Sequence, residues 1–182
     1  MRSTELEAMI GSFKFVFESS SKSYPQTYLI FKLAYKLALD GLKCLIITKP
    51  IARSSFGKIL NERQWLSPDV LELIQFRQFK SATCLIDWCH CFLNGQAMPH
   101  AILLNGFEDF CDVTEFLAYY LCACLIDTAK HLTKCLSEKN INFHLILAFK
   151  SSTYNNRPAF FDMFRNILSA EEVVKQFNVN TH

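Results

Sequence analysis

Residues 101–110 read AILLNGFEDF, an apolar run that ends at Asn105 and the turn signal Asn105-Gly106. Every position of 101–104 is apolar, whereas a strand with one wet face would alternate apolar and polar residues. The run therefore predicts a strand that is covered on both faces, as in parallel sheets. Largely apolar runs of similar length occur at three other places: Phe13–Phe17, Leu42–Thr48 and Phe143–Phe149.

Patterns of helical period separate these runs. The stretch Pro25–Asp40 carries apolar side chains at helical spacing, starts with a proline and is followed by Gly41, as helices often are. Such alternation of strands and helices is typical of an α/β fold with a mostly parallel sheet flanked by helices. A further strand is predicted at Val70–Phe76. Further helices are predicted at Ala82–Leu93, Val113–Glu138, Phe160–Leu168 and Ala170–Phe177.

The composition is that of a globular protein. The chain has 182 residues, of which 51% are hydrophobic and 20% are charged, so it contains enough apolar material for a core. We expect a single domain over residues 1–182, with its core at about 13–150. The formal net charge of +2 excludes the strong overall field of a polybasic protein, and no membrane association is expected.

The 8 cysteines are expected to be reduced thiols, as in an intracellular protein. Several lie in apolar runs, where a free thiol behaves as a small hydrophobic side chain. Cys84, Cys89 and Cys91 lie on one predicted helix, so their side chains would point to different faces. Because a second pair of ligands is also missing, no metal site is predicted.

The loop after the first strand is where a phosphate-binding P-loop would lie. A P-loop needs glycines, whose N–H groups converge on phosphate, then a lysine and a hydroxyl for magnesium. When the start of the helix is aligned with that motif, Tyr24 takes the lysine position and Pro25 the hydroxyl position. We therefore predict a degenerate nucleotide loop, expect no cofactor and do not expect ATP to bind. The loop consists of Glu18, Ser19, Ser20, Ser21, Lys22, Ser23, Tyr24 and Pro25 and contains no glycine.

The end of the run 101–104 has the outline of a second ATPase motif, Walker B, in which an acid at the end of a strand orders magnesium. Asn105 stands in the place of that acid, and its neutral amide is a weak partner for magnesium. Glu108 and Asp109 follow and are candidate acids, although solvated loop acids are the commoner outcome. The motif is therefore degenerate, and no catalytic residue is predicted.

These residues resemble a known family. The stretch 101–110 is similar to the Walker B region of RecA-like recombinase paralogs, and more narrowly to the animal paralog that associates with a SWIM-domain zinc protein in a Shu-type complex. The segments Ile74–Phe76, Ala118–Leu121 and Leu125–His131 fit as well. The order of predicted elements from Phe13 to Phe149 also agrees with this family.

The resemblance implies a RecA-like (P-loop NTPase-type) sheet and a SWIM-domain zinc protein or another recombinase paralog as partner. It also implies single-stranded DNA binding, support of a recombinase filament in homologous recombination repair, and location in the nucleus. ATPase activity would be implied too, but both nucleotide motifs depart from the family's pattern. We therefore expect a non-catalytic assembly subunit. A DNA-stimulated ATPase of the same family and an unrelated intracellular α/β enzyme stay open as alternatives.

In the resembled fold, the loop after the fifth strand contacts DNA. Here that loop contains Lys150, Tyr154, Asn155 and Arg157, and this mixture of cations, an aromatic ring and an amide suits single strands. An ordinary polar loop is the alternative. A second group of DNA-binding candidates lies in the least periodic part of the sequence and consists of Arg53, Lys58 and Arg63.

Overall fold

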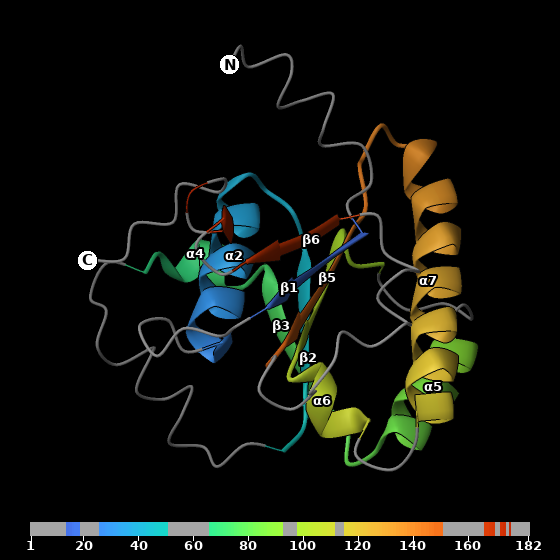
Figure 1. Cartoon of the computed structure of the whole chain (residues 1–182). Coiled ribbons are helices and arrows are strands. Elements are labelled where there is room, and N and C mark those ends of the chain that lie inside the picture. The colour runs from blue at the N-terminus through green and yellow to red at the C-terminus, as the bar shows by residue number, and fades with distance from the viewer. Residues whose placement is uncertain are drawn as a thin grey trace.

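Strands form one sheet of six, in the order β3-β2-β4-β5-β1-β6, and every neighbouring pair is parallel (Figure 1). They are β1 Lys14–Glu18, β2 Cys44–Thr48, β3 Ile74–Gln78, β4 Ala101–Asn105, β5 His144–Phe149 and β6 Asn166–Ser169. The structure is a computed structural model that describes residues 14–18, 26–50, 66–92, 98–111, 115–150, 166–169, 172, 173 and 175. Residues 14–18, 115 and 166–169 are described by their backbone alone.

Helices cover both faces of the sheet. One face packs against α2, Gln26–Leu39, and the short helix α4, Pro68–Leu71. The other packs against α5, Ala82–Cys91, and α7, Glu115–Ser137, which contact each other in one layer (Figure 1). A further short helix, α6, Phe107–Phe110, follows β4 directly. The α/β fold with a parallel sheet between helices, predicted from the apolar runs, is confirmed.

The central strands explain why the apolar runs do not alternate. Every residue of β2, β4 and β5 is buried. In β4, Leu103 belongs to the core on the α2 side, whereas Ile102 and Leu104 belong to the core on the α5–α7 side. Because each fully buried aliphatic side chain contributes roughly 1.5–3 kcal/mol, both faces of these strands stabilise the sheet.

The sequence determines the buried face of α2 and its C-terminal end. Its buried side chains Leu29, Ile30, Leu33 and Leu37 recur at helical spacing, which directs one face to the sheet. After the last turn, the N–H of Leu42 donates to the carbonyl of Leu37 at 3.0 Å and the N–H of Gly41 to that of Ala38 at 2.9 Å. This is a Schellman ending, and it needs the left-handed φ of +79° at Gly41. The chain then turns directly into β2.

The third strand differs from the prediction at Val70–Phe76, since β3 begins only at Ile74 and the residues before it form α4. Pro68 lies in the first turn of α4, where its missing N–H costs nothing. The N–H of Leu71 donates to the carbonyl of Ser67 at 3.1 Å. β3 forms one edge of the described sheet, which explains why most of its residues are not buried.

The C-terminal prediction is partly wrong. A helix was expected over Phe160–Leu168, yet Asn166–Ser169 forms β6, which pairs with β1. Residues 160–165 lie outside the described part of the chain. A segment this short carries too little periodicity to separate a helix from a strand, and the pairing with β1 decides. Within the helix expected at Ala170–Phe177, residues 172, 173 and 175 are helical.

Two histidines meet at the amino edge of the sheet. His144 begins β5 and its residue is 4% exposed. The backbone N–H of His144 donates to the backbone carbonyl of His100 at 3.0 Å. Burial lowers the pKa of the His144 imidazole to about 4, and the neighbouring His100 lowers it further. The His144 side chain is therefore neutral in the folded chain at neutral pH.

This burial makes stability depend on pH. An unfolded histidine has a pKa near 6.5 and the folded His144 one of about 4, so between these values the unfolded chain binds more protons. The contribution of the neutral His144 side chain to the free energy of unfolding is complete above pH 6.5. It is lost as the pH falls towards 4, by roughly 3 kcal/mol in total. His144→Asn, which does not titrate, should flatten urea-unfolding free energies measured from pH 7.5 to 4.5. An equally steep dependence in the variant would contradict this.

Candidate functional site

The carboxyl ends of the parallel strands share one edge of the sheet. Thr48 ends β2, Asn105 ends β4 and Phe149 ends β5, and α6 lies at this edge (Figure 1). Ligands of α/β proteins bind beyond such an edge because loops, helix starts and strand ends converge there. The edge is therefore the first place to look for a site, and the sequence directs attention to the same segments.

A side-chain hydrogen bond joins two distant segments at this edge. The Nδ2 amide of Asn105 donates to the Oγ1 of Thr27, in the first turn of α2, at 3.2 Å. Asn105 is 5% exposed. In P-loop ATPases, the loop hydroxyl and the Walker B acid stand in this relation to each other and hold magnesium together. The Thr27–Asn105 contact joins the start of α2 to the carboxyl end of β4.

This contact offers an alternative to the register expected for the degenerate loop. The hydroxyl that meets the end of β4 comes from Thr27, not from the position of Pro25. Gln26 then stands where the motif has its lysine, and Ser20 and Pro25 stand where it has glycines. The prediction aligned the motif on the helix start and did not consider Gln26 and Thr27, because no glycine anchors the motif in this sequence.

Polar atoms without partners surround the Thr27–Asn105 contact. The Nε2 of Gln26 and the Oδ1 of Asn105 are buried and make no hydrogen bond. Gln26 is 6% exposed and carries an uncharged amide where a P-loop carries the ammonium that meets β- and γ-phosphates. The described part of this edge therefore combines one side-chain hydrogen bond with buried amide atoms that have no partner.

Glu108 is the buried acid of the site. It lies in α6, is 6% exposed, and its Oε2 has no partner. Burial raises the pKa of the Glu108 carboxyl, and Asp109 raises it further. The backbone N–H groups of Glu108 and Lys150, with the Lys150 ammonium, act in the opposite direction. Asp109 is exposed, so these two candidate acids occupy different environments.

Gly106 allows this arrangement of acids. Its φ is +74°, and a Cβ atom there would collide with the Asp109 carboxylate. The left-handed φ therefore favours glycine in the turn after Asn105, whereas the exposed Asp109 side chain could turn away from a Cβ atom. Although a plain loop was expected after β4, this turn leads directly into α6 and brings the Glu108 carboxyl back to the edge.

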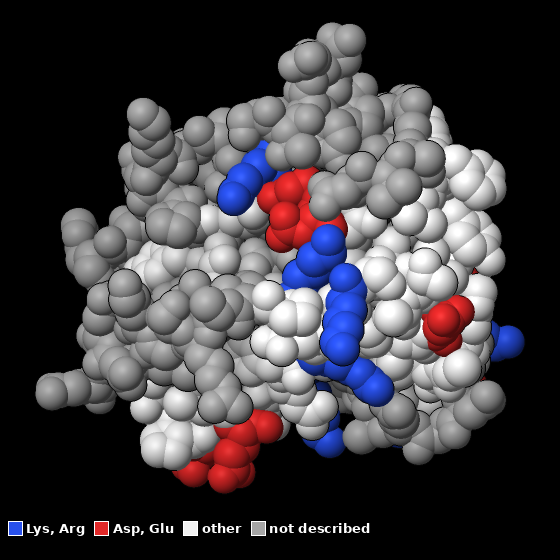
Figure 2. All heavy atoms as spheres, turned by 90° about the horizontal axis from the view of Figure 1, so that it is seen from below, with Lys and Arg blue, Asp and Glu red and all other residues white. Residues whose placement is uncertain are grey.

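Basic side chains accompany the acids at the same edge. Lys49 follows β2 and lies 5.8 Å from the ring centre of Phe110, in α6. Lys80 follows β3 and Lys150 follows β5, and both are exposed. Figure 2, which looks onto this edge, shows Lys and Arg side chains in a band beside a group of acids. Lys150 was a predicted DNA-binding residue, whereas Lys49 and Lys80 were not among the predicted DNA-binding residues.

Several predicted site residues lie outside the described residues, so nothing is said of their structure: Ser19, Ser20, Ser21, Lys22, Ser23, Tyr24, Pro25, Arg53, Lys58, Arg63, Tyr154, Asn155 and Arg157. Glu18 is the last residue of β1 and is described by its backbone alone. These residues stay predictions.

Cysteines and histidines give no metal centre in the described part of the chain, where no group of three or more potential ligands was found. The closest pairings are Cys124 Sγ with His90 Nε2 at 3.6 Å and Cys135 Sγ with His131 Nε2 at 3.4 Å. Burial raises the pKa of Cys44 to about 12. Burial likewise raises the pKa of Cys89 to about 12, so both stay protonated thiols rather than nucleophilic thiolates.

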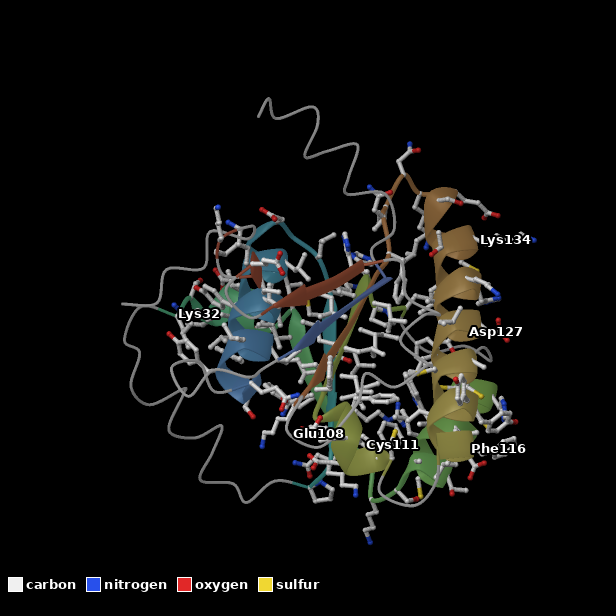
Figure 3. The ribbon with its side chains drawn as sticks, viewed as in Figure 1. Lys32, Glu108, Cys111, Phe116, Asp127 and Lys134 are labelled. Atoms are coloured by element: carbon white, nitrogen blue, oxygen red, sulfur yellow. The ribbon has the colours of Figure 1, made fainter. Side chains whose placement is uncertain are left out.

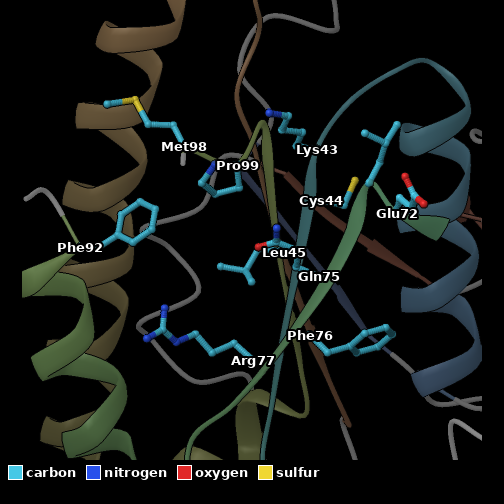
Figure 4. A pocket seen from close by; sticks show the side chains of 11 residues that line it. Lys43, Cys44, Leu45, Glu72, Gln75, Phe76, Arg77, Phe92, Met98 and Pro99 are labelled. Carbon is cyan, nitrogen blue, oxygen red and sulfur yellow. The ribbon is translucent and has the colours of Figure 1, made fainter. Parts of the chain in front are cut away.

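A pocket of about 460 Å³ lies beside β2 and β3, where Arg77, Phe92 and Met98 surround it (Figure 4). It is lined by Lys43, Cys44, Leu45, Glu72, Leu73, Gln75, Phe76, Arg77, Phe92, Met98 and Pro99. None of these residues belongs to the Thr27–Asn105 site. The pocket mixes charged and apolar side chains and brings no pair of carboxylates or histidine together.

Comparison with known proteins adds no assignment: neither a scan against protein-family models nor a search of curated proteins found a match to this chain. Among the described helices, none has the length and apolar character needed to cross a membrane. Function is therefore argued from the residues of the site.

The uncharged character of the Thr27–Asn105 contact can be tested with Asn105→Asp. Because position 105 is 5% exposed, an ionised carboxylate there should lower the free energy of unfolding by about 2 kcal/mol at pH 7. This corresponds to a fall of about 4–8 °C in melting temperature. The loss should shrink near pH 4, where the new carboxyl becomes protonated.

Asn142→Asp, at an exposed position before β5, is the matched control and should leave the melting temperature nearly unchanged. Both variants are compared by thermal denaturation at the two pH values. If Asn105→Asp were as stable as the parent at pH 7, a cation would have to face position 105, and the neutral site described above would be wrong.

Proposed function

We propose that this chain is a non-catalytic, RecA-like recombinase paralog. In this proposal it assembles with a SWIM-domain zinc protein or another recombinase paralog, binds single-stranded DNA and promotes recombinase filament assembly in homologous recombination repair. The observation that carries the proposal is the Thr27–Asn105 hydrogen bond of 3.2 Å. In this proposal, the bonded pair stands where a P-loop hydroxyl and a Walker B acid would hold magnesium, with groups that cannot perform that chemistry.

The strand order supports the RecA-like part of the proposal. The strand before the degenerate loop, β1, and the strand that ends at Asn105, β4, are separated by β5. RecA-like ATPases have the same arrangement, with one strand between their two nucleotide-binding strands. Thr27 in α2 still reaches Asn105 across this separation, as the hydroxyl of a P-loop helix would.

Chemistry supports the non-catalytic part. Phosphoryl transfer requires magnesium, held by a hydroxyl and a carboxylate, together with a lysine that stabilises charge on the phosphates. Asn105 supplies an amide in place of the carboxylate, and Gln26 an amide in place of the ammonium. Joined directly to each other, Thr27 and Asn105 hold α2 against β4 without magnesium. A chain built in this way keeps the fold for assembly while giving up hydrolysis.

Charge at the carboxyl edge supports DNA binding. Lys49, Lys80 and Lys150 follow three different strands and so form a basic surface next to the degenerate site (Figure 2). Single-stranded nucleic acids bind to such surfaces through their phosphates, and the affinity falls as salt rises. A few cations neutralise only a few phosphates, so this chain is expected to bind DNA weakly by itself and better within a complex.

An active ATPase is the second candidate because of Glu108. This carboxyl is buried at the same edge, and its pKa is raised, as is common for groups that take part in catalysis. If the chain hydrolyses ATP despite its neutral Gln26 and Asn105, Glu108 is the residue most suited to position or activate the attacking water.

One experiment separates the candidates. The chain is co-expressed with the SWIM-domain zinc protein of its own organism, and the purified material is assayed for stoichiometry, ATP turnover and single-stranded DNA binding. We expect a stable complex that binds DNA with or without ATP. Glu108→Gln should change neither assembly nor DNA binding, and no ATP turnover should be detected in either form.

Magnesium-dependent turnover that Glu108→Gln abolishes would replace the proposal with the ATPase. A chain that binds no SWIM-domain protein, no recombinase paralog and no DNA would contradict the recombination role altogether. The unrelated α/β enzyme would then be the remaining candidate.

The basic edge makes a separate prediction. In the same complex, Lys80→Ala combined with Lys150→Ala should weaken single-stranded DNA binding. The slope of log affinity against log salt should fall by about 1.4, because each phosphate contact on a single strand contributes about 0.7. Fluorescence anisotropy with a labelled oligonucleotide over a salt series measures both effects.

The control removes the same charge from the opposite edge of the sheet. Lys36 lies in the last turn of α2, and Lys139 lies before β5; both are exposed. Lys36→Ala combined with Lys139→Ala should leave the salt slope unchanged. Equal effects of the two double variants would mean that net charge, rather than the carboxyl edge, governs binding.

A further inference from the structure

Helix α7 presents one continuous stripe to solvent. At about 100° per residue, residues that differ by three, four or seven positions share a face of a helix. The outward stripe of α7 consists of Phe116, Tyr120, Ala123, Asp127, Lys130 and Lys134, of which all but the half-buried Ala123 are exposed. Figure 3 shows Phe116, Asp127 and Lys134 pointing away from the sheet along the outer side of the molecule.

The stripe changes character from one end of the helix to the other. Its first turns are aromatic: Phe116 is 78% exposed and Tyr120 is 45% exposed. Their rings stack with centres 6.4 Å apart and planes 4° from parallel. Its last turns are basic, with Lys130 and Lys134. Asp127 lies between the two parts and is bound to Lys130 at 3.1 Å.

We propose that a second copy of this chain docks on the outward stripe, with the two α7 helices antiparallel. A two-fold axis level with residue 125 brings residue 116 of one copy opposite 134 of the other. The same axis brings 120 opposite 130, and 123 opposite 127. A symmetric interface requires such self-complementarity, since one patch must match itself. At each end of the dimer, Phe116 of one copy then faces Lys134 of the other, while Tyr120 and Lys130 lie at the same level on opposite sides of the seam.

The chemistry of these pairs favours association. A lysine ammonium is attracted to the face of an aromatic ring, and Phe116 and Lys134 lie on the same line of the helix surface. Ala123, near the axis, is small enough for the two backbones to approach closely. Asp127 comes near its symmetry mate, but its charge is already balanced by Lys130 of its own copy.

The aromatic end of the stripe is held in place before any docking. The Tyr120 ring makes an edge contact with the imidazole of His90, in α5, with ring centres 6.4 Å apart and planes at 67°. The Phe116 ring stacks on Tyr120 in turn. Side chains that are already ordered lose less entropy on binding, which favours the complex.

This inference is independent of the proposed function. The stripe lies in the α5–α7 layer, whereas Asn105 and the basic residues lie at the carboxyl edge. Two helices bury less than the roughly 1,200 Å² of a standard stable interface. The dimer should therefore be weak and should form only at the upper end of a concentration series.

The test exchanges the two ends of the stripe. Sedimentation equilibrium of the full chain over a concentration series gives the dissociation constant of the parent and of each variant. Phe116→Lys places lysine against lysine in the dimer and should weaken it about tenfold or more. Adding Lys134→Phe restores an aromatic–lysine pair at both ends and should return the dissociation constant to within about threefold of the parent.

Lys36→Phe, which adds an aromatic ring at an exposed site in α2, is the control and should leave the dimer unchanged. Circular dichroism confirms that each variant is folded. A parent chain that stays monomeric, or a double variant that is no tighter than Phe116→Lys, would overturn the proposal. If the parent is monomeric but Phe116→Lys loses the SWIM-domain complex, the stripe binds that partner instead.

Discussion

Burial of β2, β4 and β5 on both faces is the constraint on which the rest of the structure depends. Strands covered twice need helices on each side, and connections that cross the sheet through those helices make the strands parallel. Parallel strands in turn bring their carboxyl ends, and the helix starts that follow them, to a single edge. Thr27 and Asn105, 78 residues apart in the chain, therefore meet within hydrogen-bonding distance.

That edge contains more buried polarity than the fold requires. Gln26, Asn105 and Glu108 each leave a buried polar atom without a partner, and such atoms cost free energy that an apolar edge would avoid. Proteins tolerate this cost mainly where function has shaped the interior. The proposed function accounts for this cost, because a nucleotide site whose lysine and acid had been replaced by amides would keep buried polar groups at this edge.

Sequence patterns predicted the elements whose burial is uniform. The runs at 101–104 and 143–149 became β4 and β5, and the helices at 82–93 and 113–138 became α5 and α7 with small shifts at their ends. Prediction failed where contacts with other segments decide the secondary structure. β3, at the sheet edge, starts later than expected, and Asn166–Ser169 pairs with β1 instead of forming a helix. Asn105 was identified from its position, whereas Thr27 emerged only from its contact, because no glycine anchored the motif.

The length of α7 bears on what its outer face is for. A strand of five residues, such as β4, spans about 17 Å, whereas the 23 residues of α7 span about 34 Å. Buried residues nevertheless line α7 from Ala118 to Leu136, so its inner face packs against the core along almost the whole helix. The outward stripe runs along the same turns, which separates its aromatic end from its basic end by most of the helix. A partner that lies along α7 can contact both ends at once, so the order of residues along the stripe favours a contact that runs the length of the helix.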